Sequence, residues 1–141
     1  MNDEPEVRPA HFPREYGARG GEGDEPLPWE EVEARLCDAL NYWITTVTPS
    51  GVPHARPVDG VWVQGALCFG GSDDTRWVRN LQTNPAMSVH LPSGDDVVVL
   101  EGTVEYVTDP EDPRASASSD ATRKKYPQYF SSDDPVPFQP F

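Results

Sequence analysis

Arginine side chains and a threonine carry the clearest chemical signal in this sequence. Between residues 27 and 107 the lysine and arginine residues are Arg35, Arg56, Arg76 and Arg79, and the last two follow Thr75 in a segment with helical character. A helix N-terminus offers free backbone N–H groups, and a neighbouring guanidinium adds charge-assisted donors, so this pattern suits an anion such as a phosphate. The alternative is an ordinary exposed first helical turn with surface arginines.

A histidine, a tryptophan and a cysteine are the other candidates for chemistry. His54 follows a turn proline and could act as an acid or base near neutral pH, although a solvated ring at a strand start explains it equally well. Trp77 could stack on or wall off a bound ring, but a tryptophan four residues before Leu81 is more often part of a core. For Cys68 a buried, inert thiol is favoured. The cysteines and histidines lack the spacing of a metal site, so we expect no bound metal.

Short strands separated by turn signals must position these residues. Apolar residues recur at three- and four-residue steps over 28–41, which predicts an amphipathic helix. Strands are expected over 42–48, 54–63 with an interruption at Asp59-Gly60, 66–70, 86–91 and 97–107, and helices over 73–84 and the central part of 109–129. This order favours an antiparallel β-barrel with a few helices. In the longest strand, Val98, Leu100, Val104 and Tyr106 should face one way, and Gly102 suggests a bulge or a barrel corner.

The chain divides by composition into a tail, a domain and an arm. Residues 1–26 are rich in charge, proline and glycine, which predicts a flexible acidic tail, because such a segment buries too little apolar area to offset its ordering entropy. Residues 27–130 would form the one domain. Residues 131–141 contain Pro135, Pro137 and Pro140 between apolar residues and would form an extended arm.

Charge and apolar runs exclude several classes of partner. The formal net charge of −13 argues against nucleic acid and anionic membranes, because both depend on Lys and Arg contacts to phosphate. The longest apolar run, Val97 to Leu100, is far too short to span a bilayer, and the N-terminus is unlike a signal peptide. We therefore expect a cytoplasmic protein.

Two motifs give the chain a family resemblance. The segments PSGVPHARPV (49–58) and SDDTRWVRNLQTNP (72–85) resemble the pyridoxamine 5'-phosphate oxidase-like split barrels, which include enzymes of FMN and of the deazaflavin F420. The resemblance implies a mainly β fold: a split β-barrel of the FMN-binding type, an antiparallel Greek-key barrel. Such barrels have a final strand after the last helix, whereas this chain continues with the proline-rich arm. The arm, a partner subunit or a continuation of the chain would then cover the open edge.

The resemblance also implies a cofactor site. Arg56 to Val58 would contact the flavin, Gly70 and Gly71 would let backbone approach it, and Thr75 and Arg76 would take its phosphate. The full set of expected cofactor-binding residues is His54, Arg56, Pro57, Val58, Gly70, Gly71, Thr75, Arg76, Trp77 and Arg79. Val61 and Trp77 stand where FMN-binding members usually have lysine, so the choice between FMN and F420 stays open.

Three functions are consistent with this sequence. The first is an oxidoreductase that transfers a hydride between FMN or F420 and a small-molecule acceptor, with the cofactor doing the redox chemistry. The second is a noncatalytic flavin, F420 or haem carrier on the same barrel, and the third is a relative that has lost its cofactor and acts through protein contacts. The resemblance also implies a homodimer with the cofactor at the subunit interface, which would bury Trp43, Trp62 and Tyr106.

Overall fold

The structure is a computed structural model that describes residues 5–8 and 26–130. The expected arm at 131–141 and most of the expected tail lie outside these residues. The elements in order are α1 (Trp29–Asp38), β1 (Tyr42–Val47), β2 (Pro53–Val58), β3 (Gly60–Val63), β4 (Ala66–Phe69), α2 (Arg76–Thr83), β5 (Ala86–His90), β6 (Val99–Thr103), α3 (Pro113–Lys125) and the short 3₁₀ helix η2 (Pro127–Tyr129). Every expected helix and strand is present, with β2 and β3 separated at Asp59 as the Asp-Gly pair indicated.

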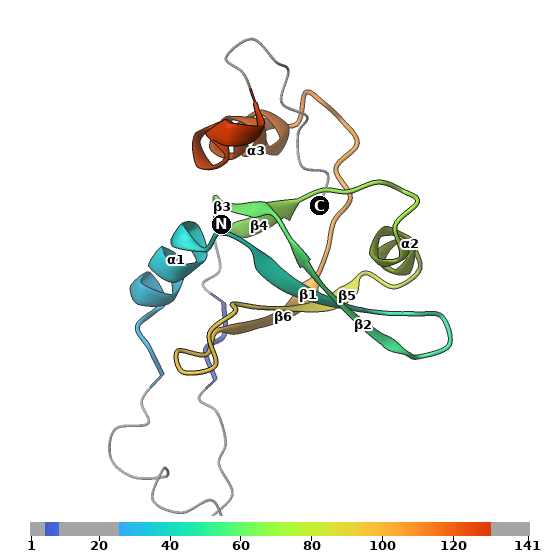
Figure 1. Ribbon diagram of the computed structural model, residues 1–141, viewed down its shortest axis with the longest axis horizontal. Helices are drawn as coiled ribbons and strands as arrows, with labels where there is room; N and C mark the ends of the chain where they lie inside the picture. The colour runs from blue at the N-terminus through green and yellow to red at the C-terminus, as the bar shows by residue number, and fades with distance from the viewer. Residues whose placement is uncertain (1–4, 9–25, 131–141) are drawn as a thin grey trace, which may run out of the picture.

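The strands form two antiparallel sheets. One has four strands in the order β2-β1-β5-β6, and the other is the β3-β4 hairpin. In Figure 1 the hairpin rises from the end of β2, with α1 and α2 on opposite sides of the strands and α3 next to the hairpin. The mainly antiparallel β fold with helices is confirmed. Within residues 26–130 no pairing joins β4 to β6, so the described strands do not form the closed Greek-key barrel that was expected.

The core lies on one face of the larger sheet, where alternate β1 side chains are buried. Tyr42, Ile44 and Thr46 have no exposed surface, whereas Trp43, Thr45 and Val47 on the other face are half-buried. Phe69 of β4 and Val78 of α2 join this core. Period-two alternation therefore decides which β1 residues are covered by α2 and the hairpin.

Helix α2 is fixed to the sheet by one buried polar pair. The Asn80 side-chain nitrogen donates to the Thr46 hydroxyl at 3.0 Å, and both side chains are buried. Burial of either polar group without a hydrogen bond would cost free energy. The pair therefore favours the one position of α2 over β1 in which both groups are bonded.

Helix α3 is fixed by a second polar cluster, which we call the Tyr126 cluster: Tyr42, Gly60, Lys125 and Tyr126. Lys125 Nζ donates to the Tyr42 hydroxyl at 2.9 Å and to the Gly60 carbonyl at 2.8 Å. The Tyr126 hydroxyl lies 3.0 Å from the same carbonyl and accepts from the Gly60 N–H at 3.1 Å. Burial lowers the pKa of Lys125 and raises that of Tyr126. The cluster joins the end of α3 to the start of β3.

Strand β6 is shorter than the pattern over 97–107 indicated. It spans Val99–Thr103, and Val104 then donates its N–H to the Pro85 carbonyl outside the strand ladder. Val98 is buried and Leu100 is half-buried, as expected, but the Tyr106 side chain is 47% exposed and not on the core face. The alternation fails there because the chain has left the sheet.

Removing residues 1–26 should leave the free energy of unfolding unchanged within experimental error. Besides Pro26, the structure describes four residues of this segment, Pro5 to Arg8, and all four are exposed. The Arg8–Glu6 ion pair joins two side chains that are both about three-quarters exposed, so it contributes little to stability. Chemical denaturation of both chains checks this. A clear drop in stability on truncation would show that the segment belongs to the fold.

Among the described residues, the structure contains no helix with the length and apolar character needed to cross a membrane.

Candidate functional site

The register of β2 decides which of its candidate residues can act together. His54 lies opposite Thr46 and Arg56 opposite Ile44, so both share the sheet face that α2 covers. His54 is half-buried and Arg56 exposed at the edge of this face. Pro57 pairs with Trp43 and therefore lies on the opposite face, and Val58 is part of the buried core.

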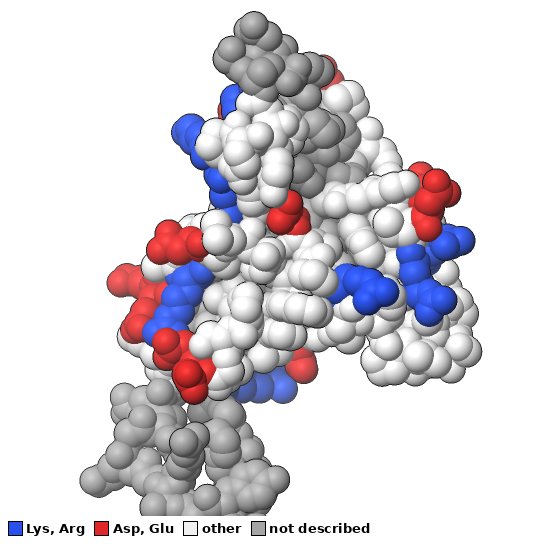
Figure 2. Space-filling view, in the orientation of Figure 1, with Lys and Arg blue, Asp and Glu red and all other residues white. Residues whose placement is uncertain are grey.

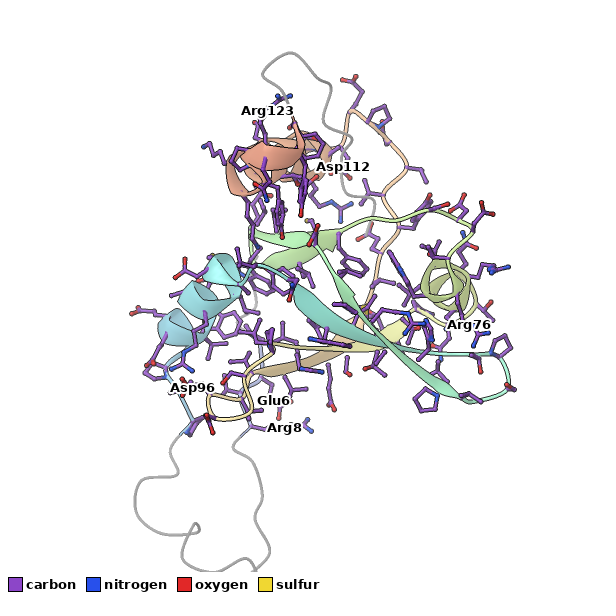
Figure 3. All side chains as sticks on the ribbon, in the orientation of Figure 1. Glu6, Arg8, Arg76, Asp96, Asp112 and Arg123 are labelled. Atoms are coloured by element: carbon purple, nitrogen blue, oxygen red, sulfur yellow. The ribbon has the colours of Figure 1, made fainter. Side chains whose placement is uncertain are left out.

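Helix α2 begins with an N-terminus that no side chain caps. The Thr75 hydroxyl donates to the Ser72 carbonyl at 2.7 Å and does not accept from an N–H of the first turn. Arg76, the first residue of the helix, is exposed, and Figure 3 shows it on the side of α2 toward the strands. Uncapped N–H groups and a guanidinium thus occur together, as an anion site requires.

The electrostatics of His54 show that these basic groups lie close enough to interact. The pKa of His54 is lowered, first by burial and then by the positive charges of Arg56 and Arg76. The imidazole is therefore neutral at pH 7, while the two guanidiniums keep their charge. Figure 2 shows basic side chains gathered at the α2 end of this face, beside a smaller acidic patch. We call the two arginines, Arg56 and Arg76, together with the neutral His54, the cationic cluster.

A hollow continues from this cluster between α2 and the β1–β2 turn. It has a volume of about 440 Å³ and is lined by Thr48, Pro49, Ser50, Val52, Arg76, Arg79 and Asn80. Arg79 Nη2 donates to the Asp74 carbonyl at 3.0 Å, which holds this arginine against the loop before α2. Of these lining residues, the sequence patterns did not indicate Thr48, Pro49, Ser50, Val52 and Asn80. The spacing of Arg76 and Asn80 on one helix face was the available signal, but nothing local indicated that the turn would pack beside it.

The fold places Gly71 against the side chain of Trp77. The Trp77 side chain is 7% exposed and packs against Phe69, with 5.5 Å between the ring centroids. A Cβ on Gly71 would lie 2.3 Å from Trp77 Cζ2. The indole is thus part of the core, as the alternative interpretation held, and Gly71 is small because the indole lies against it. Gly70, which lies between the end of β4 and Gly71, is half-buried.

Gly71→Ala should lower the free energy of unfolding by about 1–3 kcal/mol, because the new methyl group must displace a core indole. Gly94→Ala is the matched control, since a Cβ there meets nothing within 4 Å. Urea denaturation followed by tryptophan fluorescence measures both. Equal stabilities of the two variants would contradict the packing role assigned to Gly71.

Comparison with known proteins gives one family and several similar folds. The model of the family described as pyridoxamine 5'-phosphate oxidase matches residues 28–139. A conserved hypothetical protein from Mycobacterium tuberculosis has a TM-score of 0.65 at 20% identity, covering 76% of this chain and 69% of that chain. An F420 reductase has a TM-score of 0.55 at 23% identity, covering 76% of this chain and 82% of that chain.

A haem-binding protein from Mycobacterium smegmatis is also similar in structure. Its TM-score is 0.56 at 27% identity, and the match covers 77% of this chain but 49% of that chain, so the present chain spans about half its length. A search of curated proteins finds no match.

Proposed function

The chain belongs to the pyridoxamine 5'-phosphate oxidase family, and on that premise we propose that it is an oxidoreductase that uses FMN or F420. The observation that carries the proposal is the cationic cluster beside the uncapped start of α2. The similarity in fold to an F420 reductase supports a deazaflavin as one of the two cofactors.

The residues of the site fit a phosphate-bearing cofactor. Arg56 and Arg76 supply charge, Thr75 and the first turn of α2 supply hydroxyl and N–H groups, and Gly70 leaves room for backbone contact. The hollow beside Arg79 would take the part of F420 that extends beyond its phosphodiester. Pro57 and Val58 would support the β2 segment that carries Arg56, and Trp77 would support the helix from its buried side.

When bound, the cofactor accepts or donates the hydride. The protein then has to hold the phosphate, orient the ring and manage one proton. His54 is neutral at pH 7 and lies beside both arginines, so it can accept a proton from a bound molecule that gives up a hydride, or donate a hydrogen bond to a bound hydride acceptor. A bound phosphate would offset the charges of Arg56 and Arg76 and raise the pKa of His54.

A noncatalytic carrier of a flavin, F420 or haem is the second candidate. Val61 and Trp77, which stand at the usual lysine positions, are both buried, so no cation from either position reaches the site. The haem-binding protein of similar fold supports haem as the cargo in this case.

The absorption spectrum of protein freshly purified from a host that makes F420 separates these functions. Flavin or deazaflavin bands, with turnover of a reduced cofactor by added acceptors, are expected for the oxidoreductase. A Soret band would indicate the haem carrier. A colourless protein that binds none of the three cofactors would contradict both candidates.

One face of the larger sheet is covered by none of the described helices or strands, and this supports a homodimer as part of this proposal. Trp43 and His90 stack on it with an interplanar angle of 3°, and Val99 is 53% exposed beside them. Ala55 and Pro57 of β2 are exposed on the same face. Isologous pairing of two such faces would bury these side chains. We place the dimer in the cytoplasm, consistent with free cysteines Cys37 and Cys68.

Light scattering should therefore give the mass of two chains at micromolar concentration. Trp43→Lys should lower the measured mass toward that of one chain, because it places a charge in the apolar contact. Val52→Lys, at an exposed valine in the β1–β2 turn, is the control and should leave the mass unchanged. A wild-type monomer across the micromolar range would count decisively against the dimer.

A further inference from the structure

Within the described residues, the elements packed around His54 bring positive charges to it and no negative ones. The charged residue of β2 is Arg56, which shares the sheet face of His54. Helix α2, which covers this face, carries Arg76 and Arg79 and no acid. The neighbouring strand β1 has Tyr42 as its one titratable residue, four positions along the strand from the partner of His54. Arg56 and Arg76 are the charges that act on the imidazole.

Neither of these two guanidiniums is paired with a carboxylate of the described chain. Asp73 and Asp74 lie in the loop before α2 and are exposed, but neither forms an ion pair with Arg56 or Arg76. The Arg56 Nη1 atom donates to the Ala55 carbonyl at 3.3 Å, a contact within β2. Both arginines are exposed, so a ligand can reach their charged ends.

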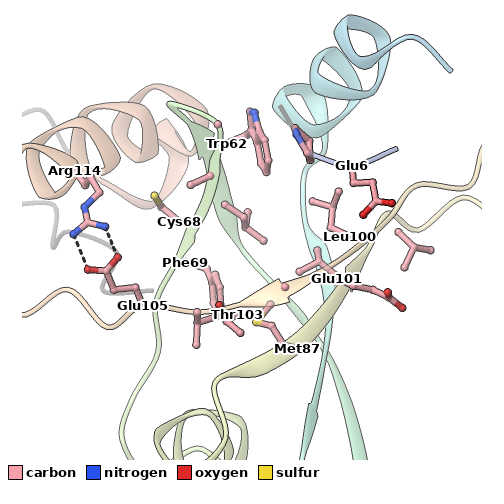
Figure 4. A pocket seen from close by; sticks show the side chains of 18 of the residues that line it. Glu6, Trp62, Cys68, Phe69, Met87, Leu100, Glu101, Thr103, Glu105 and Arg114 are labelled. Atoms are coloured by element: carbon pink, nitrogen blue, oxygen red, sulfur yellow. Dashed lines mark hydrogen bonds and ion pairs between the residues drawn. The ribbon is translucent and has the colours of Figure 1, made fainter. Parts of the chain in front are cut away.

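A larger hollow, of about 830 Å³ and lined by residues of β4 and β6 among others, shows a different arrangement (Figure 4). Arg114, which lines it, donates to Glu105 at 2.8 Å, as the dashed lines in Figure 4 mark, and to Asp112 at 2.7 Å. The chain has 24 acids against 11 lysines and arginines, so a carboxylate partner is easily found. Arg56 and Arg76, which lack one and lie beside the same histidine, therefore favour an anion from outside the chain.

The charge of that anion decides the protonation of His54. Burial and the two arginines lower the pKa of His54 in the free protein. A phosphomonoester such as that of FMN carries about two negative charges near neutral pH, whereas a phosphodiester such as that of F420 carries about one. The monoester therefore balances both guanidiniums, and the diester leaves one positive charge in excess. Because the remaining repulsion is smaller with the monoester, a proton on the imidazole costs less free energy beside it.

We propose that His54 takes up a proton when a phosphomonoester binds at the cationic cluster, and that the imidazolium then becomes the third positive partner of the phosphate. In this form both ring nitrogens are donors. Since binding and protonation are linked, the proton strengthens binding of a dianion more than binding of a monoanion. His54 thereby sets a pH-dependent specificity for a phosphomonoester. This inference rests on the proposed function, because it needs the phosphate at this site.

Nuclear magnetic resonance of the imidazole protons, followed as a function of pH, tests the charge coupling without a cofactor. The His54 signal is identified by its loss in His54→Gln. We expect Arg56→Gln and Arg76→Gln each to raise the pKa of His54, because each removes a positive charge that acts on it. Lys124→Gln, at an exposed lysine of α3, is the matched control for net charge and should leave it unchanged. If neither arginine variant raises the pKa, the inference is overturned whatever the protein binds.

The second measurement adds three ligands with the same ring: FMN, riboflavin 4',5'-cyclic phosphate, which is a phosphodiester, and riboflavin. FMN should raise the pKa of His54 most, the cyclic ester less and riboflavin not at all. The affinity gained through the proton appears as the pH falls through the pKa of His54 in the complex, and is complete below its pKa in the free protein. Between about pH 8 and about pH 6.5, the FMN affinity of the wild type should therefore rise roughly threefold or more relative to that of His54→Gln. Taking this ratio removes the titration of the phosphate itself, which both proteins share.

The outcomes separate this inference from the proposed function. If FMN binds but leaves the titration of His54 unchanged, or if the wild type and His54→Gln show the same pH dependence, the inference is overturned and the oxidoreductase proposal stands. The same holds if the cyclic ester raises the pKa of His54 as much as FMN does, or if F420 binds and FMN does not. If neither FMN nor F420 binds, the proposed function fails and this inference fails with it.

Discussion

Arg76→Ala should weaken binding of FMN or F420 about ten- to a hundredfold, which corresponds to about 1.5–3 kcal/mol. Arg76 is exposed at the first residue of α2, and its charge acts on His54 together with that of Arg56. A guanidinium there makes charge-assisted bonds to a phosphate that a methyl group cannot replace. Fluorescence-quenching titrations of the variant and the wild type measure the change.

Two further variants give this experiment its controls. Lys124→Ala removes an exposed charge in the last turn of α3 and should leave affinity unchanged, which separates a local contact from net charge. Arg79→Ala should matter less for FMN than for F420, because Arg79 lines the hollow beyond the cationic cluster. Should Arg76→Ala bind both cofactors as well as the wild type does, the phosphate assignment is wrong.

Tyr126→Phe should lower the free energy of unfolding by about 1–3 kcal/mol, because it removes the hydroxyl that accepts from the buried Gly60 N–H. The hydroxyl accepts from the Gly60 N–H at 3.1 Å and lies 2.6 Å from the Leu40 carbonyl. In a domain of this size the loss corresponds to a decrease in melting temperature of roughly 5–15 °C. Thermal unfolding followed by circular dichroism measures it.

Tyr129→Phe is the matched control for that variant. Tyr129 stacks against Tyr126 at 6.0 Å between ring centroids, but its side chain is 64% exposed. Removing its hydroxyl should change the melting temperature by no more than about 2 °C, since exposed polar groups contribute little. If both variants unfold at the same temperature, the Tyr126 cluster does not fix α3 to the hairpin.

The helices and strands could be predicted from the sequence because the residue patterns that indicate them are local. The Asp-Gly pair at 59–60 divided β2 from β3, and alternation placed Tyr42 and Ile44 in the core. Local signals were insufficient where tertiary contacts decide. In the sequence, Tyr106 continues the alternation of apolar residues in β6. The chain leaves the sheet after Thr103, however, and Tyr106 is exposed.

The candidate site, too, was predictable where local patterns decide and not where tertiary contacts decide. The helix predicted over 73–84 put Arg76 in its first turn, and Arg76 is the first residue of α2. The resemblance implied that Arg56 and Pro57 contact the cofactor together, whereas the strand places these consecutive residues on opposite faces. Gly71 lies against the indole of Trp77, a contact that requires the three-dimensional position of α2, and its expected approach to a cofactor stays a prediction. The hollow beside the β1–β2 turn was equally inaccessible to local patterns.

The most direct test of the central claim compares cofactors with and without their phosphate. FMN is titrated against riboflavin, and F420 against its phosphate-free deazaflavin ring, with the wild-type protein under identical salt conditions. If the cationic cluster binds the phosphate, at least one phosphate-bearing cofactor should bind about tenfold or more tightly than its phosphate-free counterpart. Equal affinities within both pairs, or no binding of either phosphate-bearing cofactor, would contradict a phosphate site at His54, Arg56 and Arg76.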